Sequence, residues 1–316
     1  MRILVTGGGG FIGYETARAL TGRGDTVVAF DTAFGKPVMA LAHDSDRIHI
    51  EHGDMTDLAN VAQVFDRHRP DAVVHLAAVV GVPSSVGSPS NILRVNVQGS
   101  LNVFEAMRLF RVRRVIHLST EEVYGDFVRD SADEDHPQRP TNPYGVTKLA
   151  VEHFGRSYGE LHGLQCINLR TSWVYGVGLD RPRPPMNYLE AALSGREVDL
   201  PAGADTVTDF AYVDDVVNGI LLALDHPSHR YDVYNIASGQ GVSDQELIDE
   251  IRRLLPQARL KVGPGRRTFA TGHRIPLKGA LDCSRARDEF GYVPRHDLRR
   301  GLAAYVDRWR ERASTA

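Results

Sequence analysis

Two groups of side chains in the sequence could move a proton. Tyr144 and Lys148 are four positions apart, so on a helix they share one face and an ammonium projects beside a phenol. A nearby cation favours the phenolate and lowers the pKa of the tyrosine toward that of a useful general base. Thr120, Glu121 and Glu122 form the second group, in which a hydroxyl and two carboxylates could serve acid–base chemistry. For Glu121 a solvated loop position is an equally good interpretation.

A glycine-rich segment near the N-terminus predicts a binding site for phosphate. Thr6–Gly13 follows a short apolar run, and Gly7, Gly10 and Gly13 allow a tight turn, close approach of a pyrophosphate and close packing of helix on strand. The next helix starts here, so its free N–H groups and its dipole face the phosphates. Asp31 ends the second apolar run, where a carboxylate accepts hydrogen bonds from an adenosine ribose and repels a 2′-phosphate. The segment therefore favours NAD over NADP.

The elements that position these residues alternate between short strands and helices. Consecutive apolar positions predict strands that are buried on both faces, at Ile3–Val5, Thr26–Phe30, Arg47–Ile50, Ala72–Leu76, Val115–Leu118 and Cys166–Leu169. Helix-length segments separate them, including Ile12–Thr21, Leu58–Arg67, Ile92–Phe110 and Tyr144–Leu161. This alternation predicts an α/β fold with a Rossmann-like, doubly wound parallel sheet. Ligands of such sheets bind outside the carboxyl ends of the strands, which is where the Thr120 group lies.

The regular alternation of strands and helices ends near residue 172. Arg181–Pro185 is a proline-rich loop, and shorter strands and helices follow at Asp214–Leu224, Asp232–Ile236, Ser243–Leu254, Ala258–Val262 and Leu298–Arg310. Ser243 and Glu246 have the spacing of a capping box. We therefore expect residues 1–171, with the segment near 209–236, to form a dinucleotide-binding domain. Residues 172–208 and 237–316 are expected to form a smaller C-terminal α/β part that binds the substrate.

The composition excludes several classes of protein. Apolar residues make up 42% and charged residues 24% of the chain, which is ordinary for a globular protein and excludes wholesale disorder. A net charge of −3 speaks against nucleic acid as a partner. Cys166 and Cys283 lie in no disulfide or zinc pattern, so no metal is expected. Without a signal-peptide layout or an apolar run near the roughly 18 residues of a membrane span, we expect a cytoplasmic protein that does not bind membranes.

Taken together, these motifs resemble those of an extended short-chain dehydrogenase/reductase, in the NAD-dependent epimerase/dehydratase group that modifies nucleotide sugars. The resemblance covers almost the whole chain. Its motifs are Thr6–Gly13, Gly53–Met55, His75–Ala78, Asn96–Gly99, Ser119–Gly125, Tyr144–Lys148, Asp209–Asp215 and Tyr234–Gly239. The resemblance implies contacts with NAD from Gly7, Gly10, Phe11, Ile12, Gly13, Asp31, Asp54, Met55, Leu76, Ala77, Ala78, Asn96, Ser119, Tyr144 and Lys148.

The same resemblance implies catalytic roles. Tyr144 would take a proton from a sugar hydroxyl while hydride passes to the nicotinamide. Lys148 would lower the pKa of the tyrosine and bind the nicotinamide ribose, and Thr120 would hydrogen-bond the reacting oxygen. Enzymes of this group often return the hydride, so that NAD is recycled and a transient ketone opens epimerisation, dehydration or decarboxylation. The Thr-Glu-Glu sequence is similar to the Thr-Asp-Glu of sugar 4,6-dehydratases, and Glu122 also matches the Glu of UDP-glucuronate decarboxylases.

Two positions depart from the pattern of the group. Trp173 stands where Asn is common, and Thr208 stands where an Arg usually precedes Asp-Phe. Both positions usually help to hold the diphosphate of the substrate, and loss of an Arg removes a bidentate clamp. Thr208 argues against a decarboxylase. Arg181 or Arg183 could replace the clamp, although a solvated loop explains them as well.

Three functions therefore remain open. The first is an epimerase or dehydratase of a nucleotide-activated sugar. The second is a net dehydrogenase of a free sugar acid, uronate or polyol. The third is a protein that senses NAD without catalysis, against which Thr120, Tyr144 and Lys148 speak. The resemblance also implies a homodimer, in which helices at Ile92–Phe110 and Tyr144–Leu161 pair as a four-helix bundle.

Overall fold

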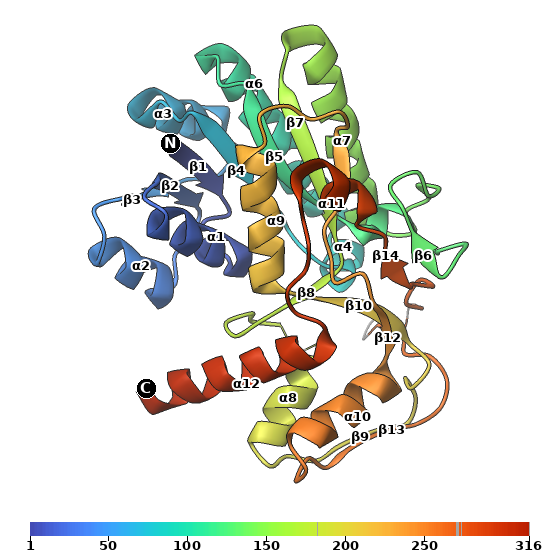
Figure 1. The fold of residues 1–316 in the computed structure, drawn as a ribbon. Helices are drawn as coiled ribbons and strands as arrows, with labels where there is room; N and C mark the ends of the chain where they lie inside the picture. The colour runs from blue at the N-terminus through green and yellow to red at the C-terminus, as the bar shows by residue number, and fades with distance from the viewer. Residues whose placement is uncertain (182, 270–271, 273, 316) are drawn as a thin grey trace.

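The computed structural model describes residues 1–181, 183–269, 272 and 274–315, and its largest feature is one seven-stranded sheet (Figure 1). The strand order is β3-β2-β1-β4-β5-β7-β11, and every neighbouring pair is parallel. This confirms the predicted doubly wound sheet, with β11 adding a strand from the second half of the chain. The strands are β1 (Arg2–Thr6), β2 (Thr26–Asp31), β3 (Ile48–His52), β4 (Ala72–His75), β5 (Arg114–Thr120), β7 (Gln165–Thr171) and β11 (Val233–Asn235).

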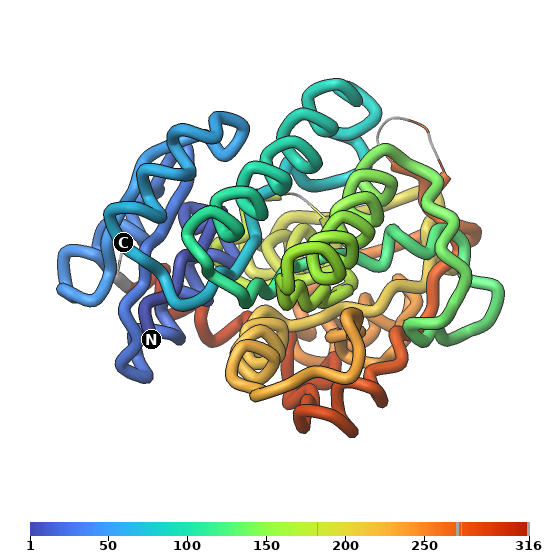
Figure 2. Tube along the Cα trace, turned by 90° about the horizontal axis from the view of Figure 1, so that it is seen from above, coloured from blue at the N-terminus to red at the C-terminus, as the bar shows by residue number. Residues whose placement is uncertain are grey.

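Helices cover both faces of this sheet, as the view from above shows (Figure 2). In β1, Ile3 and Val5 belong to one buried cluster and Leu4 to the opposite one, as expected for a strand buried on both sides. The covering helices are α1 (Phe11–Gly22), α2 (Lys36–His43) and α9 (Val213–Asp225), and α3 (Leu58–His68), α6 (Gly99–Phe110) and α7 (Pro143–His162).

The predicted helix Ile92–Phe110 is interrupted. A short helix α5 (Pro89–Leu93) leads into a π-helical turn over Arg94–Gln98, and α6 follows it. The Ser100 hydroxyl in α6 donates to the Asn96 carbonyl of the turn at 2.5 Å, a side-chain bond that competes with the hydrogen bonds of the helix. A further short helix, α4 (Val82–Gly87), precedes this region.

The second part of the chain lies below the sheet in Figure 1 and has its own buried cluster. The predicted capping box is confirmed, because the side chains of Ser243 and Glu246 each bond the backbone of the other at the start of α10. The elements here are β8 (Trp173–Tyr175), α8 (Met186–Leu193), β9 (Val198–Leu200), β10 (Val207–Tyr212), β12 (Gly241–Ser243), α10 (Asp244–Leu254), β13 (Leu260–Val262) and α12 (Leu298–Thr315). Helix α11 (Ser284–Phe290) instead packs beside β11 of the large sheet.

A late segment of the chain returns to the loop that follows β5. Strand β14 (Ala280–Leu281) pairs with β6 (Ser131–Ala132), which lies in the loop after β5. This pairing brings Lys278 beneath the carboxyl end of β5. Pro182 of the predicted loop Arg181–Pro185 lies outside the described residues. No described helix is both long and apolar enough to cross a membrane.

Candidate active site

A deep cleft of about 2150 Å³ runs along the carboxyl ends of the strands and continues into the second part of the chain. Pockets for one small ligand usually measure about 300–1000 Å³, so this cleft has room for a dinucleotide and a second ligand. All the site residues predicted from the sequence line it, apart from Asn96 and Thr208. Segments from both parts of the chain therefore meet at one site.

The glycine-rich loop leaves space that any side chain would fill. Gly7 has a φ of +72°, and a Cβ there would lie 2.7 Å from the Ala77 nitrogen. A Cβ on Gly13 would lie 2.0 Å from the Gly7 carbonyl oxygen, so the helix packs directly on the loop. Helix α1 begins at Phe11 after Gly10, with no side chain capping its first N–H groups. Free donors at a helix N-terminus fit the pyrophosphate of a dinucleotide.

Asp31 ends β2 at the edge of this loop. Its Oδ2 accepts from the Gly9 nitrogen at 3.1 Å and its Oδ1 from the Thr32 nitrogen at 2.7 Å. These bonds orient a carboxylate that still lines the cleft. A carboxylate at this place fits the ribose hydroxyls of NAD and repels the 2′-phosphate of NADP. The loop and Asp31 together fit NAD.

Asn96 supports the cleft wall from behind instead of lining it. Its amide accepts from the Val79 nitrogen at 2.8 Å and donates to the Val79 carbonyl at 3.0 Å. It also donates to the Thr147 hydroxyl at 3.2 Å, which ties the segment after β4 to α7. Its side chain therefore fixes the wall on which Leu76, Ala77 and Ala78 lie, and the contact with NAD expected of Asn96 stays a prediction.

Helix α7 places Tyr144 and Lys148 in the cleft. Asn142 caps the helix by accepting from the Gly145 nitrogen at 2.9 Å. Burial raises the pKa of Tyr144 to about 12, and the largest opposing effect comes from the charge of Arg181. Lys148 donates to the Leu118 carbonyl at 2.7 Å, and burial lowers its pKa to about 8. The expected lowering of the tyrosine pKa by Lys148 is thus outweighed by burial, because the ammonium turns toward β5.

The two glutamates after β5 differ in their surroundings. Glu122 accepts from the Asn142 amide at 2.7 Å and lies 3.8 Å from the Lys278 ammonium. Glu121 is 1% exposed, and its two carboxyl oxygens have no partner among the described residues. Burial raises the pKa of Glu121 to about 8, against the opposing charge of Lys278. Glu121 is therefore not a solvated loop residue but a carboxyl group that is mostly protonated at neutral pH.

The substrate end of the cleft carries a stack of one aromatic ring and two cations. Arg183 and Arg267 each lie 5.3 Å from the centre of the Trp173 ring. The Arg267 Nε is 2.6 Å from a carboxylate oxygen of Asp244. One Arg183 nitrogen donates to the Val174 carbonyl at 2.6 Å, whereas its buried Nε has no partner in the described part of the chain. Such a stack suits an anionic ligand with a flat group.

The two other predicted substrate residues lie apart. Arg181 donates to the Val80 carbonyl at 3.1 Å and lines the cleft near the cofactor side. Thr208 is 1% exposed within β10, where it pairs with Val242, and it does not line the cleft. The position where the group commonly has an Arg is therefore closed in this chain, and Arg267 reaches the same end of the cleft from another segment.

Comparison with known proteins identifies the family. The description of the matching family model is "NAD dependent epimerase/dehydratase family", and it covers residues 3–237. The chain belongs to this family. It is 31% identical over 99% of its length to a UDP-glucose 4-epimerase of Mycolicibacterium smegmatis, all of which is covered.

Two solved structures of the family are similar over the whole chain. A UDP-glucose 4-epimerase of Thermotoga maritima with UDP-glucose has a TM-score of 0.87 at 28% identity, with 99% of this chain and 100% of that chain covered. A dTDP-glucose 4,6-dehydratase of Streptomyces venezuelae with bound NAD has a TM-score of 0.87 at 29% identity, with 99% and 98% covered. The protein is thus an NAD-dependent enzyme of the epimerase/dehydratase family.

In this member of the epimerase/dehydratase family, three site residues escaped sequence analysis. Arg267 and Lys278 follow no motif, and only the chain path brings Arg267 to the cleft and Lys278 to the Glu121 carbonyl. His117 left a signal, since it is a titratable residue in the middle of an apolar strand. Its ring lies behind Lys148, with 3.3 Å between the Nε2 and the ammonium. Among the described residues, no group of three His, Cys, Asp or Glu side chains could hold a metal ion.

Proposed function

We propose that the enzyme modifies a nucleotide-activated sugar through a transient ketone and recycles its NAD. The observation that carries this proposal is the convergence of Thr120, Tyr144 and the protonated Glu121 in a cleft with room for a dinucleotide and a second ligand. Residues 1–171 with 209–236 would hold the cofactor, and residues 172–208 with 237–316 the sugar. The similar proteins support the substrate class, since one of them is a structure with UDP-glucose.

In this proposal Tyr144, Thr120 and Lys148 each have a separate role in the reaction. Bound NAD would accept a hydride from the sugar and return it. The Tyr144 phenol would remove the hydroxyl proton of the sugar, and the Thr120 hydroxyl would hold the same oxygen. The third proton of the Lys148 ammonium is free of the two bonds described above and would reach the cofactor ribose. Arg181 and Arg183 would favour the phenolate of Tyr144.

Within this class the glutamates favour dehydration. Elimination of a hydroxyl two carbons from the transient ketone needs an acid for the leaving oxygen and a base for the C–H proton on the carbon between them. Glu121 can donate a proton near neutral pH because burial keeps it protonated. The Glu122 carboxylate, held by Asn142 and Lys278, would accept the carbon-bound proton. An epimerase needs neither group, so Glu121→Gln should abolish elimination while hydride transfer from the sugar persists.

The stack at Trp173 supports a phosphorylated substrate. Arg183 and Arg267 would hold a diphosphate between them in place of the missing Arg, with Trp173 against the nucleotide. The same chemistry fits the carboxylate of a free sugar acid, and the closed position of Thr208 favours that second candidate, a net dehydrogenase. The two charged groups of a diphosphate could engage both arginines, whereas the single carboxylate of a small acid could engage one of them.

A substrate panel separates these functions. The enzyme is incubated with NAD and with UDP-, dTDP- and GDP-linked sugars and free sugar acids, while NADH absorbance and product NMR are followed together. A new sugar without lasting NADH supports the recycling proposal, and the product spectrum distinguishes a 4-keto-6-deoxy sugar from an epimer. Stoichiometric NADH from a free sugar acid would instead establish the net dehydrogenase.

We also propose a homodimer formed through α6 and α7, which lie side by side on one face (Figure 2). Val146, Phe154 and Leu161 of α7 follow one stripe and are exposed, as is Leu109 of α6. Large exposed apolar side chains that share a helix face commonly mark an interface. Light scattering should give the dimer mass, and Phe154→Glu should give the monomer mass, whereas Val293→Glu on another surface should not.

A further inference from the structure

His117 is a buried titratable residue to which the proposed mechanism gives no role. It lies in β5 with 0% exposure, two residues before Ser119 at the wall of the cleft. Its Nε2 is 3.3 Å from the Lys148 ammonium, and its Nδ1 is 2.9 Å from the Asn168 Oδ1. Burial and the charge of Lys148 hold the pKa of the imidazole well below its usual range, so the ring is neutral at neutral pH.

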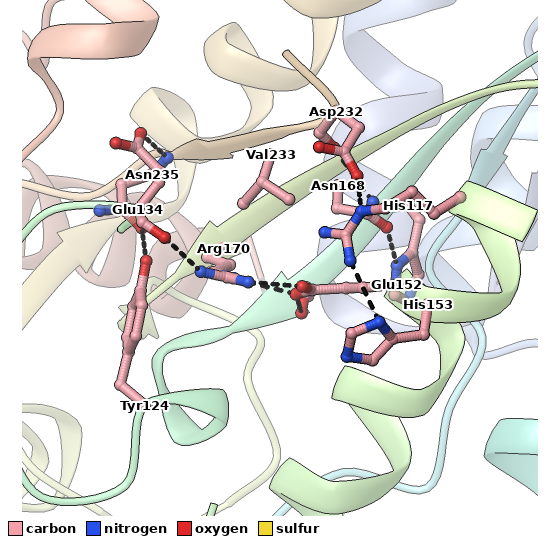
Figure 3. Close-up of polar contacts among 12 residues, drawn as sticks. His117, Tyr124, Glu134, Glu152, His153, Asn168, Arg170, Asp232, Val233 and Asn235 are labelled. Atoms are coloured by element: carbon pink, nitrogen blue, oxygen red, sulfur yellow. Dashed lines mark hydrogen bonds and ion pairs between the residues drawn. The ribbon is translucent and has the colours of Figure 1, made fainter. Parts of the chain in front are cut away.

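The partners of His117 determine which nitrogen carries its proton. An ammonium can only donate, so the Nε2 facing Lys148 must accept. The proton is then on Nδ1 and is donated to the Asn168 Oδ1. The Asn168 amide nitrogen donates in turn to the Asp232 carbonyl at 3.0 Å. Figure 3 shows this row of side chains, which crosses from β5 through β7 to the residue before β11.

The end of this row is anchored on α7 itself. The Asp232 carboxylate accepts from the Arg156 Nε at 2.5 Å, and Arg156 lies two turns after Lys148 on the same helix. The Arg156 guanidinium is also 3.1 Å from the Nδ1 of His153 on the same helix. The row of side chains that starts at Lys148 therefore ends at a second residue of the same helix.

The other charged groups near Lys148 are already engaged. Glu152, one turn later on α7, raises the lysine pKa by its charge, but its oxygens bind Arg170 at 3.0 and 2.6 Å (Figure 3). One of them also accepts from the Ser119 hydroxyl at 2.5 Å. His75 on β4 is neutral, since burial lowers its pKa to about 3, and it bonds Thr6 and Ser100. Tyr144 is neutral as well, because burial raises its pKa to about 12. His117 and the Leu118 carbonyl are left as the acceptors for the ammonium.

We propose that His117 is a positioning residue, which as the neutral Nδ1–H tautomer holds the Lys148 ammonium at the cofactor side of the cleft. Two of the three ammonium protons are then fixed on β5, and the third is aimed at the ligand. Loss of the Nε2 acceptor would leave a buried ammonium with one hydrogen bond fewer, which lowers its pKa and frees it to rotate. The inference uses the proposed function only for the role of Lys148 toward NAD.

The tautomer is measured directly on the full-length wild-type enzyme. Nitrogen NMR of the histidine rings should give a protonated Nδ1 and an unprotonated, hydrogen-bonded Nε2 for His117, unchanged between pH 6 and pH 7.5. Lys148→Met should shift the Nε2 signal toward that of a free acceptor and leave Nδ1 in place. A protonated Nε2, an imidazolium within that pH range, or an Nε2 insensitive to Lys148→Met would overturn the proposal.

A pair of variants then tests the effect on the lysine. His117→Leu removes the acceptor, whereas the amide oxygen of His117→Gln can replace Nε2. We expect the dissociation constant of NAD to rise roughly tenfold in His117→Leu at pH 7, about one charge-assisted hydrogen bond, and to stay within about threefold in His117→Gln. The loss of NAD affinity at high pH should also begin at a lower pH in His117→Leu than in the wild type.

The comparison of the two variants decides between position and packing. Equal losses in His117→Leu and His117→Gln, or no loss in either, would overturn the proposal, because only the acceptor distinguishes them. If His117→Leu does not fold by circular dichroism, the wild-type tautomer and the pH profile of His117→Gln remain decisive. Neither measurement needs a sugar, so a failed substrate panel and a failed test of His117 are separate results.

Discussion

In the half of the cleft at the glycine-rich loop, the groups that face the ligand space belong mostly to the backbone, whereas the other half presents long side chains. Gly7 and Gly13 have no side chain, which lets the backbone segments of the first half pack closely. The N–H groups at the start of α1 supply the hydrogen-bond donors there. At the other end the Trp173 ring shapes the cleft, and the guanidinium groups of Arg183 and Arg267 are the hydrogen-bond donors.

This difference means that the cofactor-binding half tolerates few substitutions, whereas the substrate-binding half can change. A backbone cradle is set by the turn and the helix start, so few substitutions are compatible with it. A side-chain stack can be built from any segment that reaches the cleft, as Arg267 does from beyond β13. The same fold can therefore keep one cofactor and take many substrates. Variants on either side should show this division.

Tyr144→Phe should have the largest effect on turnover and almost none on the cofactor half. Removal of a general base typically slows a reaction by about 10²–10⁴-fold, and we expect about 10³-fold here. The dissociation constant of NAD, measured by fluorescence, should stay within about twofold because the ring remains in place. Tyr231→Phe, at an exposed position, is the control. Unchanged turnover in Tyr144→Phe would exclude the tyrosine as the base.

Gly13→Ala should weaken the binding of NAD by distorting the cofactor half of the cleft. Its Cβ would meet the Gly7 carbonyl oxygen at 2.0 Å, and backbone cannot move aside cheaply. We expect NAD affinity to fall by about 100-fold or more, with a lower Tm. Gly10→Ala, whose Cβ would be 3.2 Å from the same oxygen, should lose less, and Gly22→Ala, with nothing within 4 Å, should match the wild type. Three equal affinities would contradict a backbone cradle.

The same division explains how much of the site could be predicted from the sequence. The glycine spacing, Asp31 and the pair Tyr144 and Lys148 depend on local geometry, so their place on the cleft followed from the pattern of strands and helices. The parallel sheet followed from strands apolar on consecutive positions, such as β4. Local geometry also suffices for the capping box at Ser243.

What could not be predicted depends on contacts between distant segments. Lys278 bonds the Glu121 carbonyl from 157 positions away, and the sequence carries no sign of that pairing. The motif that contains Asn96 gives its position but not the direction of its side chain, and its amide bonds Val79. Thr208 lies in β10, whose residues after Val207 are all buried, and it does not line the cleft.

Arg183→Gln should affect the substrate half alone. The variant removes one charged hydrogen bond to the substrate, so KM should rise by about thirtyfold while NAD affinity stays constant. Arg196→Gln, at an exposed position near the same part of the chain, should leave both unchanged. A change in NAD affinity with an unchanged KM would place Arg183 in the cofactor half. The two halves of the cleft would then not bind cofactor and substrate separately. This measurement uses whichever sugar the panel identifies.

Glu121→Gln, which should abolish elimination as proposed above, should also change the stability of the protein, and this stability effect is the smallest of the four. The folded protein holds the Glu121 proton up to about pH 8, whereas the unfolded chain releases it near 4.5. The carboxyl group therefore contributes stability that is present at low pH and is lost as pH rises through this window, by about 1.4 kcal/mol per pH unit. Glutamine does not titrate, so urea unfolding should find Glu121→Gln increasingly more stable than the wild type between pH 6 and pH 7.5. The exposed Glu160→Gln should show no such trend, and a flat difference in Glu121→Gln would mean that its carboxyl group is ionised throughout and cannot serve as the acid.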